Sequence, residues 1–146
     1  MSLPDFNAAG DFPPGIYRST LKEVQSRLGV GSPERERLSV QLSRIVGLAR
    51  GTGCLQSLTV FGSFVSAKVR PNDVDVILIM SDDFRFEHCN RDEIVLFSHE
   101  RAQTELGASV FWIRPSLLIN DSLEPFIARW QQKRDGGLRG IVEIVE

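Results

Sequence analysis

The sequence has few cysteines and no long apolar run. Its two cysteines, Cys54 and Cys89, have no C-x-x-C spacing, which excludes the disulfide-dense frameworks of small secreted proteins and predicts free thiols in a reducing compartment. The longest apolar stretch, residues 74–80, contains Asp75 and is far shorter than the roughly 20 residues that span a bilayer. The amino-terminal residues also lack the basic and apolar segments of a secretory leader. We therefore expect a cytoplasmic protein without a membrane partner.

The sequence also lacks an excess of charge of one sign. Seventeen Lys and Arg residues stand against nineteen Asp and Glu residues, which gives a formal net charge of −2. Without a global positive field, non-specific binding to DNA is not expected, and any contact with nucleic acid must be local. The length of 146 residues and the hydrophobic content of 42% are those of one globular domain.

Local patterns predict an α/β (α+β) fold in which a small mixed β-sheet is flanked by helices. Proline and glycine up to Gly15 predict an arm over residues 1–18, followed by a single domain over 19–146. Apolar residues at helical spacing, with capping residues at their ends, predict helices over about 20–29, 33–49, 90–107 and 123–131. Short apolar and β-branched runs predict strands at 57–61, 73–80, 109–113 and 141–145. The apolar stripe of the second helix assigns Arg35 to the solvent-facing side.

Two carboxylates at the start of the second predicted strand are the main candidates for chemistry. Asp73 and Asp75 are two residues apart, and side chains at that spacing in a strand project to the same face. Two like charges held close together resist joint ionisation unless a cation or a proton compensates. Mg²⁺, or Mn²⁺ in its place, suits such a pair because it takes oxygen ligands and is often held by one or two carboxylates plus substrate phosphates.

A glycine–serine pair follows the first predicted strand. A short helix after Gly62 and Ser63 would present backbone N–H groups at the end of that strand, where they stabilise phosphate oxygens. Gly62 allows the backbone to approach a triphosphate closely, and the Ser63 hydroxyl can donate a hydrogen bond to it. Nine residues, 64–72, separate Ser63 from Asp73. That length allows adjacent strands to place the Gly-Ser turn beside the acid pair.

Gly-Ser, a spacer of about ten residues and then Asp-apolar-Asp-apolar, between apolar strands, resembles the signature of the polymerase-β-type nucleotidyltransferase superfamily. The small size is similar to that of the minimal nucleotidyltransferases of bacterial toxin–antitoxin pairs, and the carboxyl-terminal pattern from Trp130 to Glu143 is similar to that of short bacterial proteins of unassigned function with the same core. The core resemblance covers roughly residues 55–115. It implies a nucleotidyltransferase-like fold and transfer of a nucleoside monophosphate from an NTP to a protein or RNA acceptor.

The resemblance also implies roles for particular residues. Asp73 and Asp75 would hold the metal that bridges the triphosphate. Lys68 and Arg70, in the segment between the two strands, would offset its charge. The protein partner would be a toxin or an antitoxin, in a toxin–antitoxin or stress-response module.

A third carboxylate, which active members of this superfamily usually carry on a neighbouring strand, cannot be placed from the sequence. The expected strand, residues 107–113, has no acid, and Ser109 stands where one would be sought. Glu143 is a substitute if the last strand pairs beside the acid pair, and Glu100 and Asp135 are alternatives. Without a third acid the domain could bind a nucleotide, or a partner, without catalysing transfer. This non-catalytic function is the alternative hypothesis.

Several other residues have both a structural and a functional interpretation. His88 with Cys89 is a partial metal-ligand pair, and His99 on the third predicted helix either has a structural role or faces the site. Trp112 and Trp130 are core or interface residues, with base stacking as the alternative. Arg129, Lys133, Arg134 and Arg139 form either a solvated face or, with Arg134 and Arg139 foremost, a contact with phosphates or the acceptor.

Overall fold

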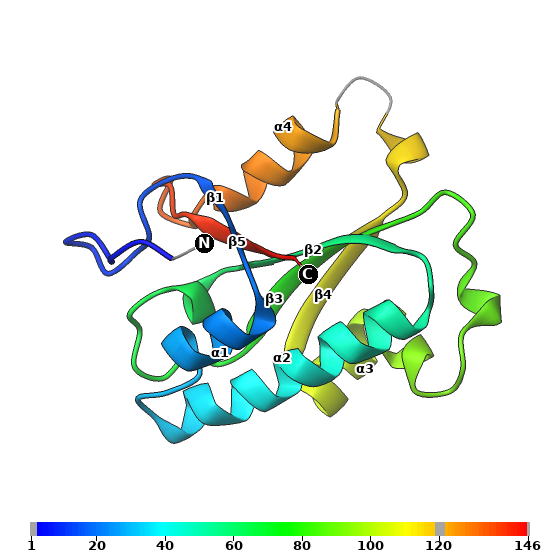
Figure 1. The fold of residues 1–146 in the computed structure, drawn as a ribbon, viewed down its shortest axis with the longest axis horizontal. Helices are drawn as coiled ribbons and strands as arrows, with labels where there is room; N and C mark the ends of the chain where they lie inside the picture. Colours follow the sequence, from blue (N-terminus) through cyan, green and yellow to red (C-terminus); the bar gives the residue numbers. More distant parts are fainter. Residues whose placement is uncertain (1–2, 119–121, 146) are drawn as a thin grey trace.

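The computed structural model of the protein describes residues 3–118 and 122–145, and its five strands form one mixed sheet. The strand order is β1-β5-β2-β3-β4 (Figure 1). Strand β1 is parallel to β5 and β3 is parallel to β4, whereas β2 is antiparallel to both of its neighbours, β3 and β5. The strands are β1 Ile16–Ser19, β2 Leu55–Phe61, β3 Val74–Met80, β4 Ala108–Ile113 and β5 Ile141–Ile144.

Helices cover both faces of this sheet. Helices α1 (Leu21–Leu28), α2 (Pro33–Gly51) and α3 (His99–Leu106) lie on one face, and α4 (Leu123–Ala128) lies on the other (Figure 1). The side chains follow this division, because alternate residues of a strand point to opposite faces. Val74, Val76 and Leu78 of β3 join the larger core under α1 to α3, while Ile77 and Ile79 join a smaller one with Ile127 of α4. The predicted fold class, a small mixed sheet flanked by helices, is confirmed.

Side-chain caps set the starts of the first two predicted helices. The Thr20 hydroxyl accepts a hydrogen bond from the Glu23 amide at 3.1 Å, and the Ser32 hydroxyl accepts one from the Arg35 amide at 3.1 Å. The single helix predicted over 90–107 is wrong, because the segment forms a 3-10 turn, Glu93–Phe97, and then α3. The break is at Ser98, whose extended backbone leaves its hydroxyl free to cap α3 by accepting from the Arg101 amide. The last predicted helix likewise ends as α4 at Ala128 and continues as a 3-10 turn to Gln131.

The amino-terminal segment is part of the sheet and of the core. Strand β1 crosses the boundary expected at residue 18 and pairs along its whole length with β5. Phe12 is fully buried and its ring stacks on that of Phe6, with 4.7 Å between the ring centroids. From residue 3 onward, therefore, the described part of this segment is held by the domain, which supplies the anchoring that a Pro- and Gly-rich arm needs to be ordered.

Arg35 is buried, which corrects its assignment to the solvent-facing side of α2. Its guanidinium donates hydrogen bonds to the backbone carbonyls of Leu28 and Phe64 at 2.9 Å each, to that of Lys68 at 2.9 Å, and to that of Ser66. Burial lowers the pKa of Arg35 from its ordinary value. Arg35 is three residues before Leu38 and seven before Leu42, so helical spacing places it on the buried face of α2, and only its charge suggested solvent. The loop between β2 and β3 folds over its guanidinium there. Arg35 thereby fixes the loop that carries Ser63 and Lys68.

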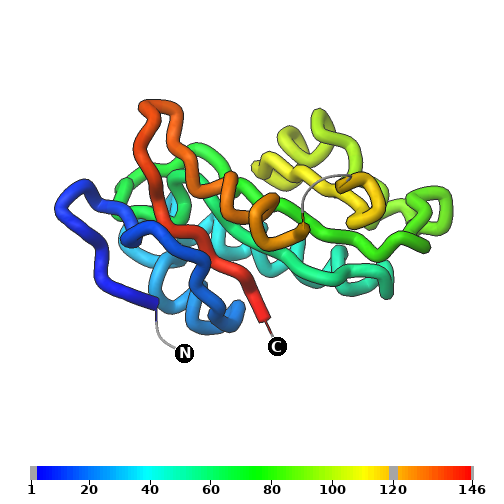
Figure 2. Tube along the Cα trace, turned by 90° about the horizontal axis from the view of Figure 1, so that it is seen from above, coloured from blue at the N-terminus to red at the C-terminus, as the bar shows by residue number. Residues whose placement is uncertain are grey.

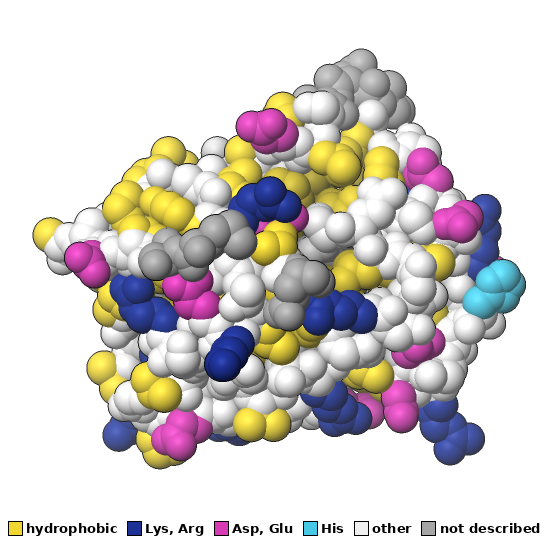
Figure 3. Space-filling model, in the orientation of Figure 1, with side chains coloured by type: hydrophobic (Ala, Val, Ile, Leu, Met, Phe, Trp, Pro, Cys, Tyr) yellow, Lys and Arg dark blue, Asp and Glu magenta, His cyan; other side chains and the backbone are white. Residues whose placement is uncertain are grey.

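The surface has no dominant charge on the face seen in Figure 3, where Lys and Arg side chains alternate with Asp and Glu. This distribution agrees with the small net charge of the chain. Over residues 3–118 and 122–145, no helix has both the length and the apolar character needed to cross a membrane.

Candidate active site

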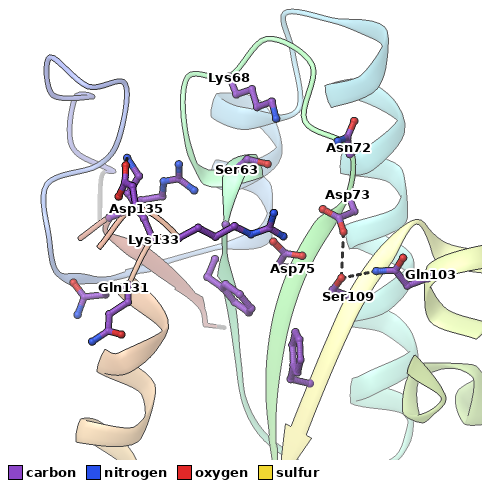
Figure 4. Close-up of a pocket in the computed structure, with 16 residues that line it drawn as sticks. Ser63, Lys68, Asn72, Asp73, Asp75, Gln103, Ser109, Gln131, Lys133 and Asp135 are labelled. Carbon is purple, nitrogen blue, oxygen red and sulfur yellow. Dashed lines mark hydrogen bonds and ion pairs between the residues drawn. The ribbon is translucent and has the colours of Figure 1, made fainter. Parts of the chain in front are cut away.

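The acid pair lies at the start of β3, on the face of the sheet that α4 partly covers. Asp75 is in register with Phe61 of β2 on one side and with Ser109 of β4 on the other. Asp73 and Asp75 line the same cleft, as the strand spacing predicts. The Ser109 hydroxyl donates a hydrogen bond to Asp73 Oδ2 at 3.1 Å and accepts one from Gln103 Nε2 at 2.6 Å (Figure 4). Helix α3 and strand β4 thus fix the orientation of Asp73.

The second carboxylate of the pair has an unusual proton affinity. Burial and the nearby charge of Asp73 raise the pKa of Asp75 from 3.8 to about 6, against the opposing effects of Ser109, Arg134 and Arg139. Desolvation disfavours the charged form of a carboxyl group, and a like charge adds to that penalty. The site therefore keeps a carboxylate in a position where its negative charge is only partly compensated by protein groups.

Gly62 is required for the packing of the acid pair as well as for the turn itself. Its backbone has a φ of 80°, a region that residues with a side chain rarely adopt. A Cβ at this position would overlap Oδ2 of Asp75. After Gly62 the chain makes a 3-10 turn, Ser63–Val65, in place of the short helix expected there. The turn ends after three residues because the chain is drawn back toward Arg35 through the carbonyls of Phe64 and Ser66.

Replacing Gly62 by Ala should therefore destabilise the fold by roughly 1–3 kcal/mol, the cost of a strained backbone, with the clash on Asp75 added. Urea unfolding followed by circular dichroism measures the loss. Gly47→Ala is the matched control, because a Cβ added at Gly47 meets no atom within 4 Å. Equal stability of the Gly62→Ala protein and the wild type would mean that the close approach of Gly62 to Asp75 does not constrain the site.

Of the two cations expected beside the triphosphate, the structure places one in the cleft. Lys68 lines the cavity together with Ser63 and Asn72, and Figure 4 shows these side chains along one rim. Arg70 is exposed and does not line it. The difference has a local cause, because Pro71 is buried and its neighbour Arg70 points outward at the bend that leads into β3.

The opposite wall of the cleft is the carboxyl-terminal turn, residues 132–139. Its Gly136 has a φ of 91°, and Lys133 and Gly137 close the turn with a backbone hydrogen bond of 2.8 Å, as its Arg-Asp-Gly-Gly composition predicts. Figure 2 shows the turn, orange to red, beside the loop between β2 and β3. Arg134, Asp135 and Arg139 line the cleft from this side, so two predicted phosphate contacts do reach it.

Asp11 holds this wall in place, and sequence reasoning missed it. Its carboxylate accepts hydrogen bonds from Lys133 Nζ at 2.8 Å and from Arg139 Nε at 2.6 Å, and only 4% of the side chain is exposed. Backbone pairing of Asp11 with Ser66 joins the same segment to the loop that carries Lys68. An isolated aspartate in a Pro- and Gly-rich segment gave no signal, because its partners are more than 120 residues away.

The structure does not bring Glu143 to the acid pair. Strand β5 lies between β1 and β2, and Glu143 is in register with Thr59 and within 3.8 Å of Arg18. Glu100 is exposed on α3 and does not line the cleft, whereas Asp135 does. Among the residues that the structure describes, no group of three or more His, Cys, Asp or Glu side chains is arranged to hold a metal ion.

Aromatic rings form the apolar end of the cleft. The cavity measures about 640 Å³, and Phe61 and Phe111 line it next to Asp75 and Ser109. Trp130 packs behind them, at 4.8 Å from Phe61 and 5.0 Å from Phe111 between ring centroids. Trp112 is on the opposite face, in contact with Phe84 and Phe97.

The remaining candidates are elsewhere in the fold or at its edge. His99 is exposed, and its ring lies 5.8 Å from that of Phe111 without lining the cleft. His88 and Cys89 line a separate hollow of about 90 Å³ with Cys54 and Glu93. Arg129 is exposed at the end of α4 and does not line the cleft.

These features define a small mixed α/β domain with an acid pair, a glycine–serine turn and a basic wall around one cleft. The chain belongs to a family of unknown function, DUF6932, whose model matches residues 4–145. That match covers the amino-terminal segment, the sheet and the carboxyl-terminal turn alike. Neither a curated protein nor a solved structure matches the chain.

Proposed function

We propose that the protein is a metal-dependent nucleotidyltransferase with the nucleotidyltransferase-like fold, which moves a nucleoside monophosphate from an NTP to a protein or RNA acceptor. The observation that carries the proposal is the convergence of Asp73 and Asp75, the Gly62-Ser63 turn and a wall with Lys133, Arg134 and Arg139 on one cleft. Carboxylates suit a metal ion, and backbone turns and arginine side chains suit phosphate oxygens. A cavity of about 640 Å³ also lies within the usual range for small-molecule sites.

The acid pair fits Mg²⁺ or Mn²⁺ as its cofactor. Both donors are oxygens, and the charge of Asp73 contributes to the raised pKa of Asp75, so a bound cation would relieve a repulsion that the protein leaves in place. When bound, the cation would neutralise charge on the triphosphate and on the transition state. Two carboxylates with substrate phosphates are a common ligand set for Mg²⁺.

The chain's own residues would bind and orient the reactants. Ser63 and Lys68 on one rim and Arg134 on the other are suited to the triphosphate oxygens. In the reaction an acceptor oxygen forms a bond to the α-phosphorus while the bond to the α,β-bridging oxygen breaks, and pyrophosphate leaves. Positioning and charge neutralisation supply most of the acceleration in such transfers. The acceptor's proton would pass to solvent or to a base of the acceptor complex.

Transfer of label tests the proposal directly. Each of four α-labelled NTPs is incubated with Mg²⁺ or Mn²⁺, the protein and cell-extract protein or RNA, and the Asp73→Asn, Asp75→Asn double variant is run beside the wild type. We expect label on a discrete acceptor with the wild type and background with the variant. Equal labelling by both proteins, or no labelling by either, would contradict the proposal. The Glu143→Gln variant should keep its activity, because Glu143 lies outside the cleft.

The alternative, a non-catalytic nucleotide- or partner-binding protein, is favoured by one specific observation. Ser109 is in register with Asp75 on the neighbouring strand, the position where a third carboxylate would complete the site. A hydroxyl there can orient Asp73 but cannot take a proton from an acceptor or ligate as strongly as a carboxylate. If the wild type binds Mg-NTP without transferring label and the double variant does not bind, this alternative replaces the enzyme. Both the nucleotidyltransferase and the non-catalytic binding protein would suit a toxin–antitoxin or stress-response module.

A further inference from the structure

The apolar end of the cleft is built from aromatic rings at the surface. Phe111 is 38% exposed although it points from the middle of β4 onto the face of the sheet that α4 covers. Phe61 is half-buried beside it, and the two ring centroids are 6.1 Å apart. Large apolar side chains on an inner sheet face are normally covered. Here the covering helix stops short, and the rings line the cleft instead.

The sheet register places these rings directly beside the acid pair. Phe61 is opposite Asp75 on β2, and Phe111 follows Ser109 by two residues on β4, on the same face. The cleft therefore has a charged end, with carboxylates and basic side chains, and an aromatic end that begins at Phe61, opposite Asp75, and continues at Phe111, two residues farther along β4 than Ser109. A ligand that filled both would carry charged phosphates at one end and a flat, apolar ring system at the other.

The aromatic end is also rigid. Trp130 lies 4.8 Å from Phe61 and 5.0 Å from Phe111, and Phe126 packs on Trp130 at 6.2 Å between centroids. Gln131, the next residue, accepts a hydrogen bond from the Gly15 amide at 2.6 Å, which fixes this turn against the start of β1. Rings that are already held in place lose little conformational freedom when a second ring packs on them.

We propose that Phe61 and Phe111 form a stacking shelf for the nucleobase of the NTP bound in this cleft. The inference rests on the proposed nucleotide site and adds to it the subsite that receives the base. Stacking suits any base, because every base has a π-face. Gln103 lies at the rim beside Ser109, to which its Nε2 donates, and its side-chain carbonyl oxygen is an acceptor that can meet a base edge (Figure 4).

Calorimetric titration separates the base from the phosphates. The wild type is titrated, with Mg²⁺, with each of the four NTPs, with the corresponding nucleosides and with inorganic tripolyphosphate. We expect the NTPs to bind more tightly than tripolyphosphate. Phe111→Ala should weaken NTP binding by about 5- to 150-fold, the range for one base stacked on one aromatic ring, and leave tripolyphosphate binding unchanged.

Further variants distinguish stacking from apolar packing and from loss of the fold. Phe111→Leu keeps apolar volume and should weaken NTP binding as Phe111→Ala does, whereas Phe111→Tyr should retain it. Phe86→Ala is the matched control, since Phe86 is 45% exposed and lies outside the cleft. Thermal melts confirm that each variant is folded. In a Trp112→Phe background Trp130 is the single tryptophan, and its fluorescence should change with NTPs but not with tripolyphosphate.

The outcomes separate this inference from the proposed function. Equal binding of NTPs and tripolyphosphate, with no effect of Phe111→Ala, would overturn the shelf and leave the phosphate site standing. Full NTP affinity in the Phe111→Leu protein would overturn it as well, because volume rather than stacking would then suffice. Binding of nucleosides that depends on Phe111, without any binding of tripolyphosphate, would support the shelf and contradict the proposed triphosphate site. If none of these ligands binds, both the stacking shelf and the proposed nucleotide site are overturned.

Discussion

Replacing Asp11 by Ala is expected to lower the free energy of unfolding by about 2–4 kcal/mol. The change removes the acceptor of two charge-assisted hydrogen bonds and leaves Lys133 and Arg139 partly buried without it, at 23% and 19% side-chain exposure. Breaking one side of a buried ion pair typically costs about 3–5 kcal/mol, and the residual exposure of both cations reduces that figure. Asp11 also joins the amino-terminal segment to the carboxyl-terminal turn, so the loss should loosen the wall of the cleft.

Urea unfolding of wild type and variant at pH 7 measures the change. Asp135→Asn is the matched control, because Asp135 lies 3.8 Å from the same Lys133 but its side chain is 70% exposed, and exposed ion pairs contribute little. Burial opposes the ionisation of Asp11, but the hydrogen bonds from Lys133 and Arg139 outweigh it and hold its pKa below 3.8. This contribution to stability is therefore complete above pH 3.8 and is lost as the pH falls through the lower folded-state pKa. Equal losses in both variants would contradict the role assigned to Asp11.

The local part of the site could be predicted from the sequence because its signals are local. Asp73 and Asp75 share a face through the period of two in a strand, and Gly62 marks the turn that faces them. The caps at Thr20 and Ser32 fix helix starts for the same reason. In each case the partners are within a few residues of one another or lie on adjacent strands joined by a short segment.

What sequence reasoning missed depends on contacts between distant segments. Asp11 meets Lys133 and Arg139 only because the two ends of the chain pair in the sheet as β1 and β5. Arg35 lies on the buried face of α2 by helical spacing, but the carbonyls that accept its hydrogen bonds belong to a loop some thirty residues later. The prediction that Glu143 is a substitute third acid depended on the strand order. The last strand, β5, lies between β1 and β2, and this position keeps Glu143 away from β3. Hydrophobic periodicity does not contain this information.

The exposure of Phe111 could not be predicted for a related reason. Val110 is buried on one face of β4 and Phe111 points to the other face. This pattern predicts that a helix covers Phe111. Whether a helix reaches it depends on how far α4 extends along the sheet. The sequence predicts a helix near 123–131 but not its position relative to β4.

Replacing Asp75 by Asn is expected to stabilise the protein at pH 8 in the absence of divalent cations. Burial and the charge of Asp73 raise the pKa of Asp75 from 3.8 to about 6, a rise that corresponds to about 3 kcal/mol. Below pH 3.8 the carboxyl is neutral in both the folded and the unfolded chain. Between pH 3.8 and 6 the unfolded chain releases its proton first, so the penalty on the folded state grows and is complete above pH 6. Asn carries no charge and avoids the penalty.

Thermal melts from pH 4 to 8, with chelator present, measure this difference. The midpoint of the Asp75→Asn protein should exceed that of wild type by roughly 6–12 °C at pH 8, since each kcal/mol shifts it by about 2–4 °C in a chain of this size. The excess should shrink as the pH falls from 6 toward 4. Asp5→Asn, at an exposed position, is the control and should show no pH-dependent gain. If the midpoint of Asp75→Asn exceeds that of wild type equally at pH 4 and pH 8, the gain comes from packing and not from charge. If there is no gain at pH 8, the charged form of Asp75 does not destabilise the folded protein.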